Sequence, residues 1–253
     1  MSVFRFKRFE IINQESAMKV NTDGVLLGAS VELAVPDAEG KVVQVLDVGT
    51  GTGTIALMVG QRLDDLHCTF QIEGIDIDPA SAAEASANFS NSPWSGQISA
   101  ELIDLSDLGT ELARARENGA SARKFDLIVS NPPYFDSSLR NPELRKNNAR
   151  HTDCLSYKEL LEFSRDNLSA GGRLAMILPS DVENALLRYG RMCSLFPERI
   201  IRIRTTPKKA ASRIIVQFTG ERKDLREEWL TIQDQGQYTG EYTRLVHEFY
   251  LWA

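Results

Sequence analysis

The chain has 253 residues, 42% of them hydrophobic and 25% charged, which is the composition of a globular protein rather than a disordered or fibrous one. Its three cysteines are far apart and form no CxxC pair, which argues against a disulfide framework or a zinc knuckle and favours a reducing cytoplasm. The N-terminus has no apolar secretion segment and no run of about 18 apolar residues occurs, so neither secretion nor membrane spanning is expected. The net charge of −6 gives no global sign of a nucleic-acid partner.

The first forty residues predict an N-terminal extension. Phe4, Phe6 and Phe9 indicate a strand, and Asn21-Thr22-Asp23 can cap an apolar helix over 25–33. After it, strand-like and helix-like stretches alternate, which predicts an α/β fold with a mainly parallel sheet. Seven strands are expected over 42–48, 70–77, 98–103, 125–130, 173–178, 199–204 and 212–218, and helices over 54–63, 79–88, 106–117, 156–168 and 181–193.

The sequence therefore predicts one domain over 1–253, with a Rossmann-like core over 42–219 and a C-terminal extension over 220–253. Helices are expected on both faces of the seven-stranded sheet. A monomer is favoured, although an apolar C-terminal tail can seal a sheet or form a dimer.

The first core strand ends in a glycine loop, DVGTGTG at 47–53. Glycines allow close approach of a ligand to the backbone, and the next helix offers free N–H groups. The spacing is G-x-G-x-G and not the G-x-G-x-x-G of the dinucleotide fingerprint, and a leading acid is more typical of S-adenosyl-L-methionine (SAM) sites than of NAD sites. Asp47, Gly49, Thr50, Gly51 and Gly53 are therefore candidate cofactor residues.

Two more acids end the next two strands. Asp76 can accept hydrogen bonds from both ribose hydroxyls of an adenosine, and Asp104 can accept one from the adenine amino group. The neighbouring Ile77 and Leu105 are expected beside the same ligand. Three acids at successive strand ends favour a nucleoside-containing cofactor.

The tetrapeptide Asn131-Pro132-Pro133-Tyr134 follows the fourth core strand, beside the first strand at the switch point of the sheet. A planar amine is a poor nucleophile, and acceptors for its N–H groups help it to attack. The Asn131 carboxamide oxygen and the Pro132 carbonyl supply two acceptors, and the prolines add no N–H to compete. Tyr134 offers a face on which a base can stack.

Together, DVGTGTG at 47–53, GIDID at 74–78 and NPPY at 131–134 resemble the class I SAM-dependent methyltransferases that modify a planar nitrogen. The segment MKVNTDGVLLG at 18–28 resembles the N-terminal segment of the bacterial valine-tRNA (adenine-37-N6) methyltransferases, and EFYL at 248–251 resembles that family's ending. The resemblance runs from about Phe4 to Leu251.

This resemblance implies a class I methyltransferase fold, SAM as cofactor and tRNA as substrate, with a flipped adenine in the pocket. Carried over to this chain, it implies that the methionine side of SAM contacts Asp47, Gly49, Gly51 and Gly53, the ribose Asp76 and the cofactor adenine Asp104. It also implies that Lys19 and Thr22 border the pocket and that Asn131, Pro132 and Tyr134 hold the target adenine.

Two basic clusters are candidates for RNA contact. The first, Arg140, Arg145, Lys146 and Arg150, follows NPPY, and the second has six basic residues and no acid between Arg199 and Arg213. Either can be an ordinary solvated face. Because both follow strand ends near the same cleft, we expect phosphate contacts from Arg140, Lys146, Arg150, Lys208 and Lys209. No His, Cys or carboxylate cluster has metal-ligand spacing, so no metal is expected.

Four alternatives remain open. A glutamine-N5 methyltransferase of release factors also uses NPPY, although such enzymes usually carry a helical domain before the glycine loop. A guanine-N2 methyltransferase of ribosomal RNA more often has Phe at the position of Tyr134. An NAD-dependent oxidoreductase and an inactive RNA-binding module belong to other classes of function.

Overall fold

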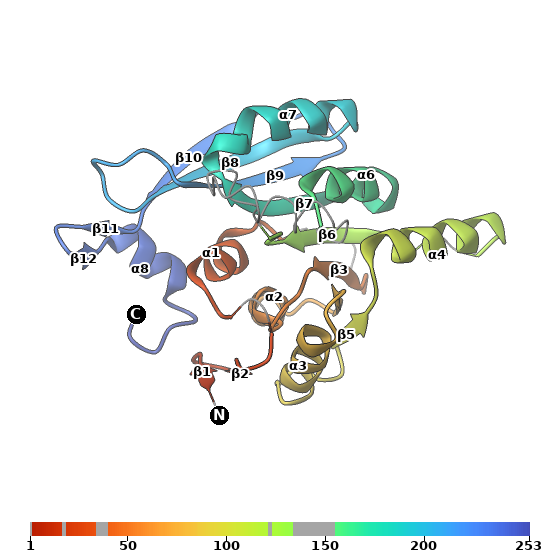
Figure 1. Ribbon diagram of the computed structural model, residues 1–253, viewed down its shortest axis with the longest axis horizontal. Helices are drawn as coiled ribbons and strands as arrows, with labels where there is room; N and C mark the ends of the chain where they lie inside the picture. The colour runs from red at the N-terminus through yellow and green to blue at the C-terminus, as the bar shows by residue number, and fades with distance from the viewer. Residues whose placement is uncertain (1, 17–18, 34–39, 121–122, 134–154) are drawn as a thin grey trace, which may run out of the picture.

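Eight strands pair side by side into one large sheet, in the order β10-β8-β9-β7-β6-β3-β4-β5 (Figure 1). The computed structural model describes residues 2–16, 19–33, 40–120, 123–133 and 155–253. The strands of the large sheet are β3 (Val43–Val48), β4 (Phe70–Asp76), β5 (Ile98–Leu102), β6 (Phe125–Ser130), β7 (Leu168–Pro179), β8 (Phe196–Arg204), β9 (Arg213–Thr219) and β10 (Arg226–Thr231). Within it, β9 is antiparallel to β7 and β8, and the other pairs are parallel.

The seven predicted core strands are confirmed as β3 to β9, and β10 is an eighth strand outside the predicted core. β3 and β6 are the short apolar runs that the sequence indicates, and β6 is buried at every position. β7 begins at Leu168 rather than at 173, so it is longer than predicted. β10 has the sequence REEWLT and is the edge strand of the sheet, paired with β8 on one side. Its charged side chains can reach water there.

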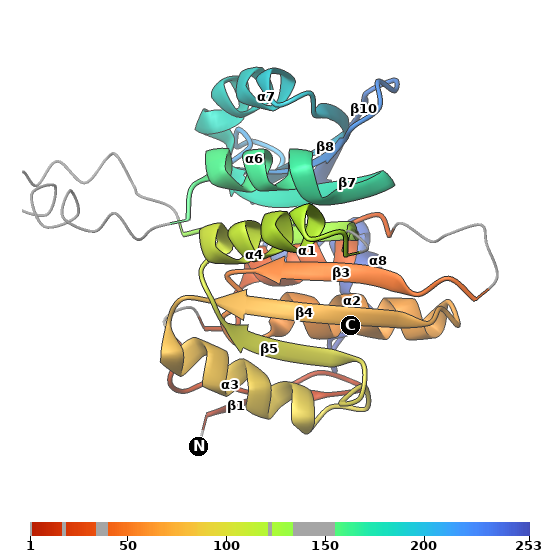
Figure 2. The same ribbon diagram turned by 90° about the vertical axis from the view of Figure 1, so that its right-hand side faces the viewer.

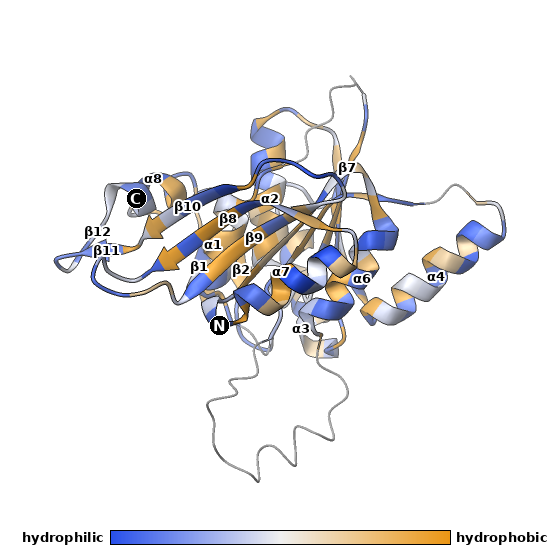
Figure 3. Cartoon of the chain, turned by 90° about the horizontal axis from the view of Figure 1, so that it is seen from above, coloured by the Kyte–Doolittle hydropathy of each residue, from blue (hydrophilic) through white to orange (hydrophobic). Residues whose placement is uncertain are grey.

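Helices cover both faces of this sheet (Figure 2). The helices α1 (Thr22–Ser30), α2 (Thr54–Asp65), α3 (Pro79–Ser90) and α8 (Gly240–Val246) contribute to one apolar core, and α4 (Leu105–Glu117), α6 (Tyr157–Asn167) and α7 (Glu183–Met192) to the other. Figure 3 shows hydrophobic residues along the central strands, whereas β10 is largely hydrophilic. None of the described helices combines the length and apolar character that a membrane crossing requires.

Three of the predicted helix starts are confirmed by their caps. The Asn21 side chain accepts the Gly24 N–H at 2.9 Å at the start of α1, and Asp78 accepts the Ser81 N–H at 2.9 Å at the start of α3. Ser156 and Glu159 form the capping box expected at the start of α6. These caps satisfy N–H groups that a helix cannot pair internally.

Short strands extend the fold at both ends of the chain. In the N-terminal segment, β1 (Val3–Arg5) pairs antiparallel with β2 (Glu10–Ile12), so the predicted strand is a hairpin. Near the C-terminus, β11 (Gln233–Asp234) pairs with β12 (Gln237–Tyr238), and a one-turn 3-10 helix, η1 (Ser180–Val182), precedes α7. The backbone N–H of Lys7 donates to the Phe249 carbonyl at 2.8 Å, which joins the two terminal segments.

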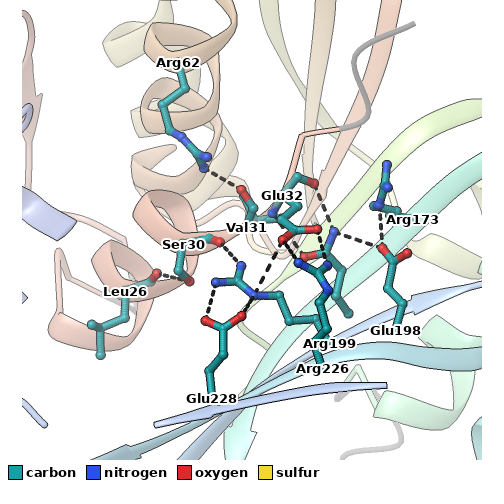
Figure 4. A network of polar contacts seen from close by, with 11 residues as sticks. Leu26, Ser30, Val31, Glu32, Arg62, Arg173, Glu198, Arg199, Arg226 and Glu228 are labelled. Atoms are coloured by element: carbon teal, nitrogen blue, oxygen red, sulfur yellow. Dashed lines mark hydrogen bonds and ion pairs between the residues drawn. The ribbon is translucent and has the colours of Figure 1, made fainter. Parts of the chain in front are cut away.

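Two arginine side chains, one on α2 and one on β8, hold the C-terminal end of α1 (Figure 4). The Arg62 guanidinium donates to the carbonyls of Gly28 and Val31 at 3.0 and 2.7 Å, and Arg199 donates to the Ser30 carbonyl at 2.7 Å. Cations at a helix C-terminus satisfy its free carbonyls and oppose the negative end of its dipole. Burial lowers the Arg62 pKa to about 10, so the side chain stays charged at neutral pH.

Candidate active site

A cavity opens at the carboxyl edge of the sheet, where the strand order reverses at β3 between β4 and β6. Open α/β sheets bind ligands at this switch point. The predicted site residues that line it are Gly49, Gly51, Asp76, Ile77, Asp104, Leu105, Asn131 and Pro133. To these the structure adds Val48, Ile75, Asp78, Ser81, Ile103 and Leu155. Most of the wall is thus apolar, with carboxylates at the ends of two strands, β4 and β5.

The glycine loop needs its glycines for backbone reasons. Gly49, Gly51 and Gly53 have φ of +70°, +56° and +79°, in the left-handed region that side chains disfavour. At Gly53 a Cβ would also lie 2.3 Å from a ring carbon of Phe89. Gly53 precedes α2 and lies beneath the loop rather than in the cavity wall, so its role is to shape the turn.

Asp47 is fully buried beneath the glycine loop and does not line the cavity. Its Oδ2 accepts the Thr50 hydroxyl at 2.8 Å and the Ala56 N–H at 3.2 Å, and its Oδ1 is buried without a partner in the described structure. Burial raises the Asp47 pKa to about 7, although these two hydrogen bonds oppose the rise. Asp47 therefore joins the start of the loop to the first turn of α2, and Thr50 contributes by donating its hydroxyl to the same carboxylate oxygen.

Asp76 connects the end of β4 to the glycine loop. Its Oδ2 accepts the Gly51 N–H and its Oδ1 accepts the Asp78 N–H, both at 2.9 Å. Burial raises the pKa of this carboxyl, and the two backbone N–H groups oppose the rise. A carboxylate oxygen can accept more than one hydrogen bond, so Asp76 keeps capacity for a ligand in the cavity that it lines.

Asp104 lies at the opposite end of the cavity, after β5. Its Oδ1 accepts the Ser106 N–H at 2.7 Å and caps α4, while the side chain also lines the cavity. The exposed Ile77 and the buried Leu105 line the cavity near it. This end therefore combines apolar side chains with one acceptor, which suits a flat heterocycle carrying an amino group.

The NPP residues follow β6 directly, beside the end of β3. The Ser130 hydroxyl donates to the Val48 carbonyl at 2.8 Å, which holds these two strand ends together. Asn131 is buried and lines the cavity, Pro132 is buried behind it, and Pro133 is exposed and lines it. Tyr134 lies outside the described residues, as do Arg140, Lys146 and Arg150.

The N-terminal segment passes beside the cavity and is held there by α3. The buried Glu84 carboxylate accepts the N–H groups of Gln14, Glu15 and Ser16 at 2.6, 2.9 and 3.0 Å. Asn88 both accepts from the Ile12 N–H and donates to its carbonyl, and it also donates to the Thr52 carbonyl in the glycine loop at 2.9 Å. One stripe of α3 thus binds the N-terminal segment and the loop at once.

Lys19 and Thr22 do not line the described cavity. The exposed Lys19 ammonium donates to the Gln14 carbonyl, and the exposed Thr22 is the first residue of α1. Sequence reasoning did not find Glu84 or Leu155. The signal for Glu84 is that it is the one charged residue in the alanine-rich α3. Leu155, which packs against Gly49, carries no local signal.

The basic run from Arg199 to Arg213 does not form one surface. Arg199 pairs with Glu228 at 2.7 Å, Arg202 with Glu183 at 2.5 Å, and Arg213 with Asp23 at 2.8 Å. Lys208 and Lys209 are exposed in the loop between β8 and β9, which lies at the same edge of the sheet as the cavity. Within the run, Arg199, Arg202 and Arg213 are thus paired, whereas Lys208 and Lys209 have no acidic partner among the residues that the structure describes.

Comparisons with known proteins agree with this geometry. A family model described as "Methyltransferase small domain" matches residues 28–191. Proteins named "tRNA1(Val) (adenine(37)-N6)-methyltransferase" from Bacteroides fragilis and Porphyromonas gingivalis are 37% and 38% identical to this chain, over 98% of it and 97% and 94% of their own lengths.

Solved structures support the fold. A predicted O-methyltransferase from Agrobacterium tumefaciens superposes with a TM-score of 0.63 at 19% identity, over 90% of this chain and 96% of that one. A type I restriction-modification methyltransferase subunit from Streptococcus thermophilus has a TM-score of 0.60 at 13% identity, over 93% of this chain and 53% of its own. At such identities the likeness concerns the fold. The chain itself belongs, by its full-length similarity, to the tRNA1(Val) (adenine(37)-N6)-methyltransferase family.

Proposed function

We propose that this protein transfers a methyl group from SAM to the N6 amino group of an adenine in tRNA, adenine 37 beside the anticodon of valine tRNA. The observation that carries this proposal is the position of Asn131 and Pro133 in the wall of the same cavity as Gly49, Asp76 and Asp104. A group that activates an amine and a group that holds an adenosine would thus face one another. A cytoplasmic location suits such an enzyme, since tRNA is modified there.

The cavity suits SAM in its donor and acceptor groups. Asp76 would accept from the ribose hydroxyls, and Asp104 from the amino group of the cofactor adenine, which would lie between Ile77 and Leu105. The glycine loop, with Gly49 and Gly51, would approach the methionine portion. Lys19 and Thr22 would border this portion, as the resemblance of their segment to the family implies. SAM supplies a methyl group that is activated by its positively charged sulfur.

Asn131 and Pro132 would prepare the target amine for attack. Each presents a carbonyl oxygen, and two acceptors on one amino group draw its lone pair out of conjugation and stabilise the charge that develops on nitrogen. Tyr134 would stack on the target base and fix its plane. The proton leaves afterwards to water, since a methylated cationic amine is strongly acidic, and the site holds reactants in line rather than supplying a base.

The target base must leave its stack to enter this cavity, and basic side chains would hold the surrounding phosphates. Lys208 and Lys209 would serve this role, since they are exposed in the loop that follows β8 at the carboxyl edge of the sheet. Arg140, Lys146 and Arg150 follow the NPPY motif and are expected to act with them.

Methyl transfer from labelled SAM tests the proposal. Unmodified valine tRNA, ribosomal RNA and release factor are offered in parallel, and the labelled product is digested to nucleosides. The expected product is N6-methyladenosine from tRNA, and Asn131→Ala should lower kcat by about 100- to 1000-fold, the range for loss of one stabilising group, while SAM still binds. Label in protein or in N2-methylguanosine would contradict the substrate, and NAD binding in place of SAM would contradict the cofactor.

A further inference from the structure

One large aromatic side chain remains uncovered on the outer strand of the sheet. Trp229 on β10 is 52% exposed. Tryptophan is seldom left so open, because its ring is among the largest apolar surfaces that a protein can bury. β10 is otherwise a charged edge strand, so this ring does not belong to an apolar patch of the strand.

An arginine side chain lies over the ring of Trp229. The Arg204 guanidinium carbon lies 5.2 Å from the ring centroid, within the distance of a cation–π contact. Two hydrogen bonds hold this guanidinium in place, from Nε to the Thr231 hydroxyl at 2.9 Å and from Nη1 to the Pro207 carbonyl at 3.2 Å. The two planar groups are therefore fixed beside each other before any ligand arrives.

Some of the cations of this surface have no acidic partner in the described part of the chain. Among the described residues, no acidic side chain pairs with Arg204, Lys208 or Lys209, and the loop 205–212 contains no acid. Glu227, the acid nearest to Trp229 on the same face of β10, is already paired with Arg202 at 3.0 Å. Arg199, Arg202 and Arg213 form ion pairs, so the cations left without a described acidic partner are Arg204 beside Trp229 and the two lysines of the loop.

This surface lies at the same edge of the sheet as the cavity. β8 runs parallel to β6 and β7, since both β7 and β8 are antiparallel to β9. The loop that follows β8 therefore emerges at the same edge as Asn131. Adjacent strands are roughly 4.8 Å apart, so β10 lies about 19 Å from β6, four strands away.

We propose that Trp229 and Arg204, together with Lys208 and Lys209, form a stacking site for an unpaired base of the tRNA that lies a few nucleotides away from the base held in the cavity. This inference rests on the proposed function. An open indole with a fixed guanidinium offers two flat surfaces for a nucleobase, and the lysines offer charge for the phosphates on either side. A nucleic-acid loop supplies both groups together, which an acidic peptide does not.

Tryptophan fluorescence tests the contact directly, without activity. The chain has three tryptophans, of which Trp94 is 2% exposed while Trp229 and Trp252 are each 52% exposed. Unmodified valine tRNA transcript is titrated into Trp252→Phe, in which Trp229 is the exposed tryptophan that remains. Stacking should quench its emission, and the quenching should be absent in Trp229→Phe, which keeps Trp252.

Affinity provides the second measurement. Trp229→Ala should raise the Kd for tRNA by roughly 5- to 150-fold, which corresponds to about 1–3 kcal/mol for one stacked base. Trp229→Phe should lose much less, and the SAM Kd should not change in either variant. Trp252→Ala is the matched control, since it removes an equally exposed indole that stacks on Tyr238 and Tyr250 instead.

The outcomes separate the two proposals. If the wild-type protein does not bind tRNA, the proposed function fails. If Trp229→Ala binds tRNA with full affinity and tRNA does not quench Trp229 in Trp252→Phe, the stacking site is refuted while the proposed function stands. A change in oligomeric state on replacing Trp229, seen by sedimentation with tRNA affinity unchanged, would assign this surface to a second copy of the chain and refute the inference.

Discussion

Replacing Asp47 by asparagine tests whether a neutral side chain suits the position beneath the glycine loop. Asp47 is fully buried, only its Oδ2 accepts hydrogen bonds, and its Oδ1 has no partner in the described structure. Asparagine can keep both accepted bonds through its own oxygen and place its amide nitrogen where Oδ1 lies. Its shape therefore copies the protonated acid, but its charge does not depend on pH.

The raised pKa of Asp47 fixes the sign of the effect. The ordinary value is 3.8 and the folded value is about 7, so between these values the folded state binds more protons than the unfolded state. The stabilisation is complete below the lower value and is lost as pH rises through the upper one. The gap between the two pKa values corresponds to roughly 4 kcal/mol, of which roughly 2 kcal/mol would be lost between about pH 5.5 and about pH 8.5.

We therefore expect Asp47→Asn to gain stability relative to the wild type as pH rises over that interval, by roughly 2 kcal/mol. Urea denaturation of both proteins at each pH measures the difference, in which other titrating groups cancel. Thr50→Val provides a second variant, because it removes a hydrogen bond that lowers the Asp47 pKa. The Asp47 pKa should therefore rise, and the loss of stability with rising pH should extend to higher pH than in the wild type. Parallel curves for wild type and Asp47→Asn would refute the reasoning, because they would mean that Asp47 is ionised at no cost.

Two further predictions concern the residues that shape the cavity. Gly53→Ala should lower the unfolding free energy by about 2–5 kcal/mol, because it combines a left-handed backbone with a clash against Phe89. A loss below about 1 kcal/mol in denaturant titrations would contradict both the backbone strain and the clash. Glu84→Gln should speed hydrogen exchange of the backbone amides at residues 14–16 by roughly 5- to 150-fold, because the side-chain NH2 of glutamine would face a backbone N–H donor. Glu111→Gln on the exposed face of α4 is the control. Equal exchange rates in both variants would contradict the role of Glu84.

The core strands and their caps could be predicted because their signals are local. The run FDLIVS is apolar enough to be buried at every position, and Asp78-Pro79 gives both the cap and the first residue of α3. β10 gave no such signal, since REEWLT neither alternates nor forms an apolar run. It becomes a strand because β8 offers it backbone partners and because Arg199 and Glu228 pair across the two strands.

The residues of the candidate site also differ in whether a local sequence signal could predict them. The positions of Asp76, Asp104 and Asn131 in the cavity wall were predictable, because parallel strands bring their carboxyl ends to one edge of the sheet. Asp47, predicted beside them, instead lies buried beneath the glycine loop. Leu155 and Glu84 were not, because their importance depends on contacts with Gly49 and with residues 14–16, which lie far away in the sequence. The same limit applies to the basic run, where acids distant in sequence pair with three arginines, while Lys208 and Lys209 have no such partner in the described parts of the chain.

The three predicted acids share a feature that connects stability with binding. Asp47, Asp76 and Asp104 each accept at least one backbone N–H from the loop or helix that follows a strand. These bonds fix the loops before a ligand is present, so the cavity owes its shape to these carboxylates, of which Asp76 and Asp104 line it and would later contact the ligand. A substitution at Asp76 therefore removes a ligand contact and releases the Gly51 N–H together. Its loss of affinity should exceed the value of one ribose hydrogen bond, because the loop must then be ordered at the expense of binding.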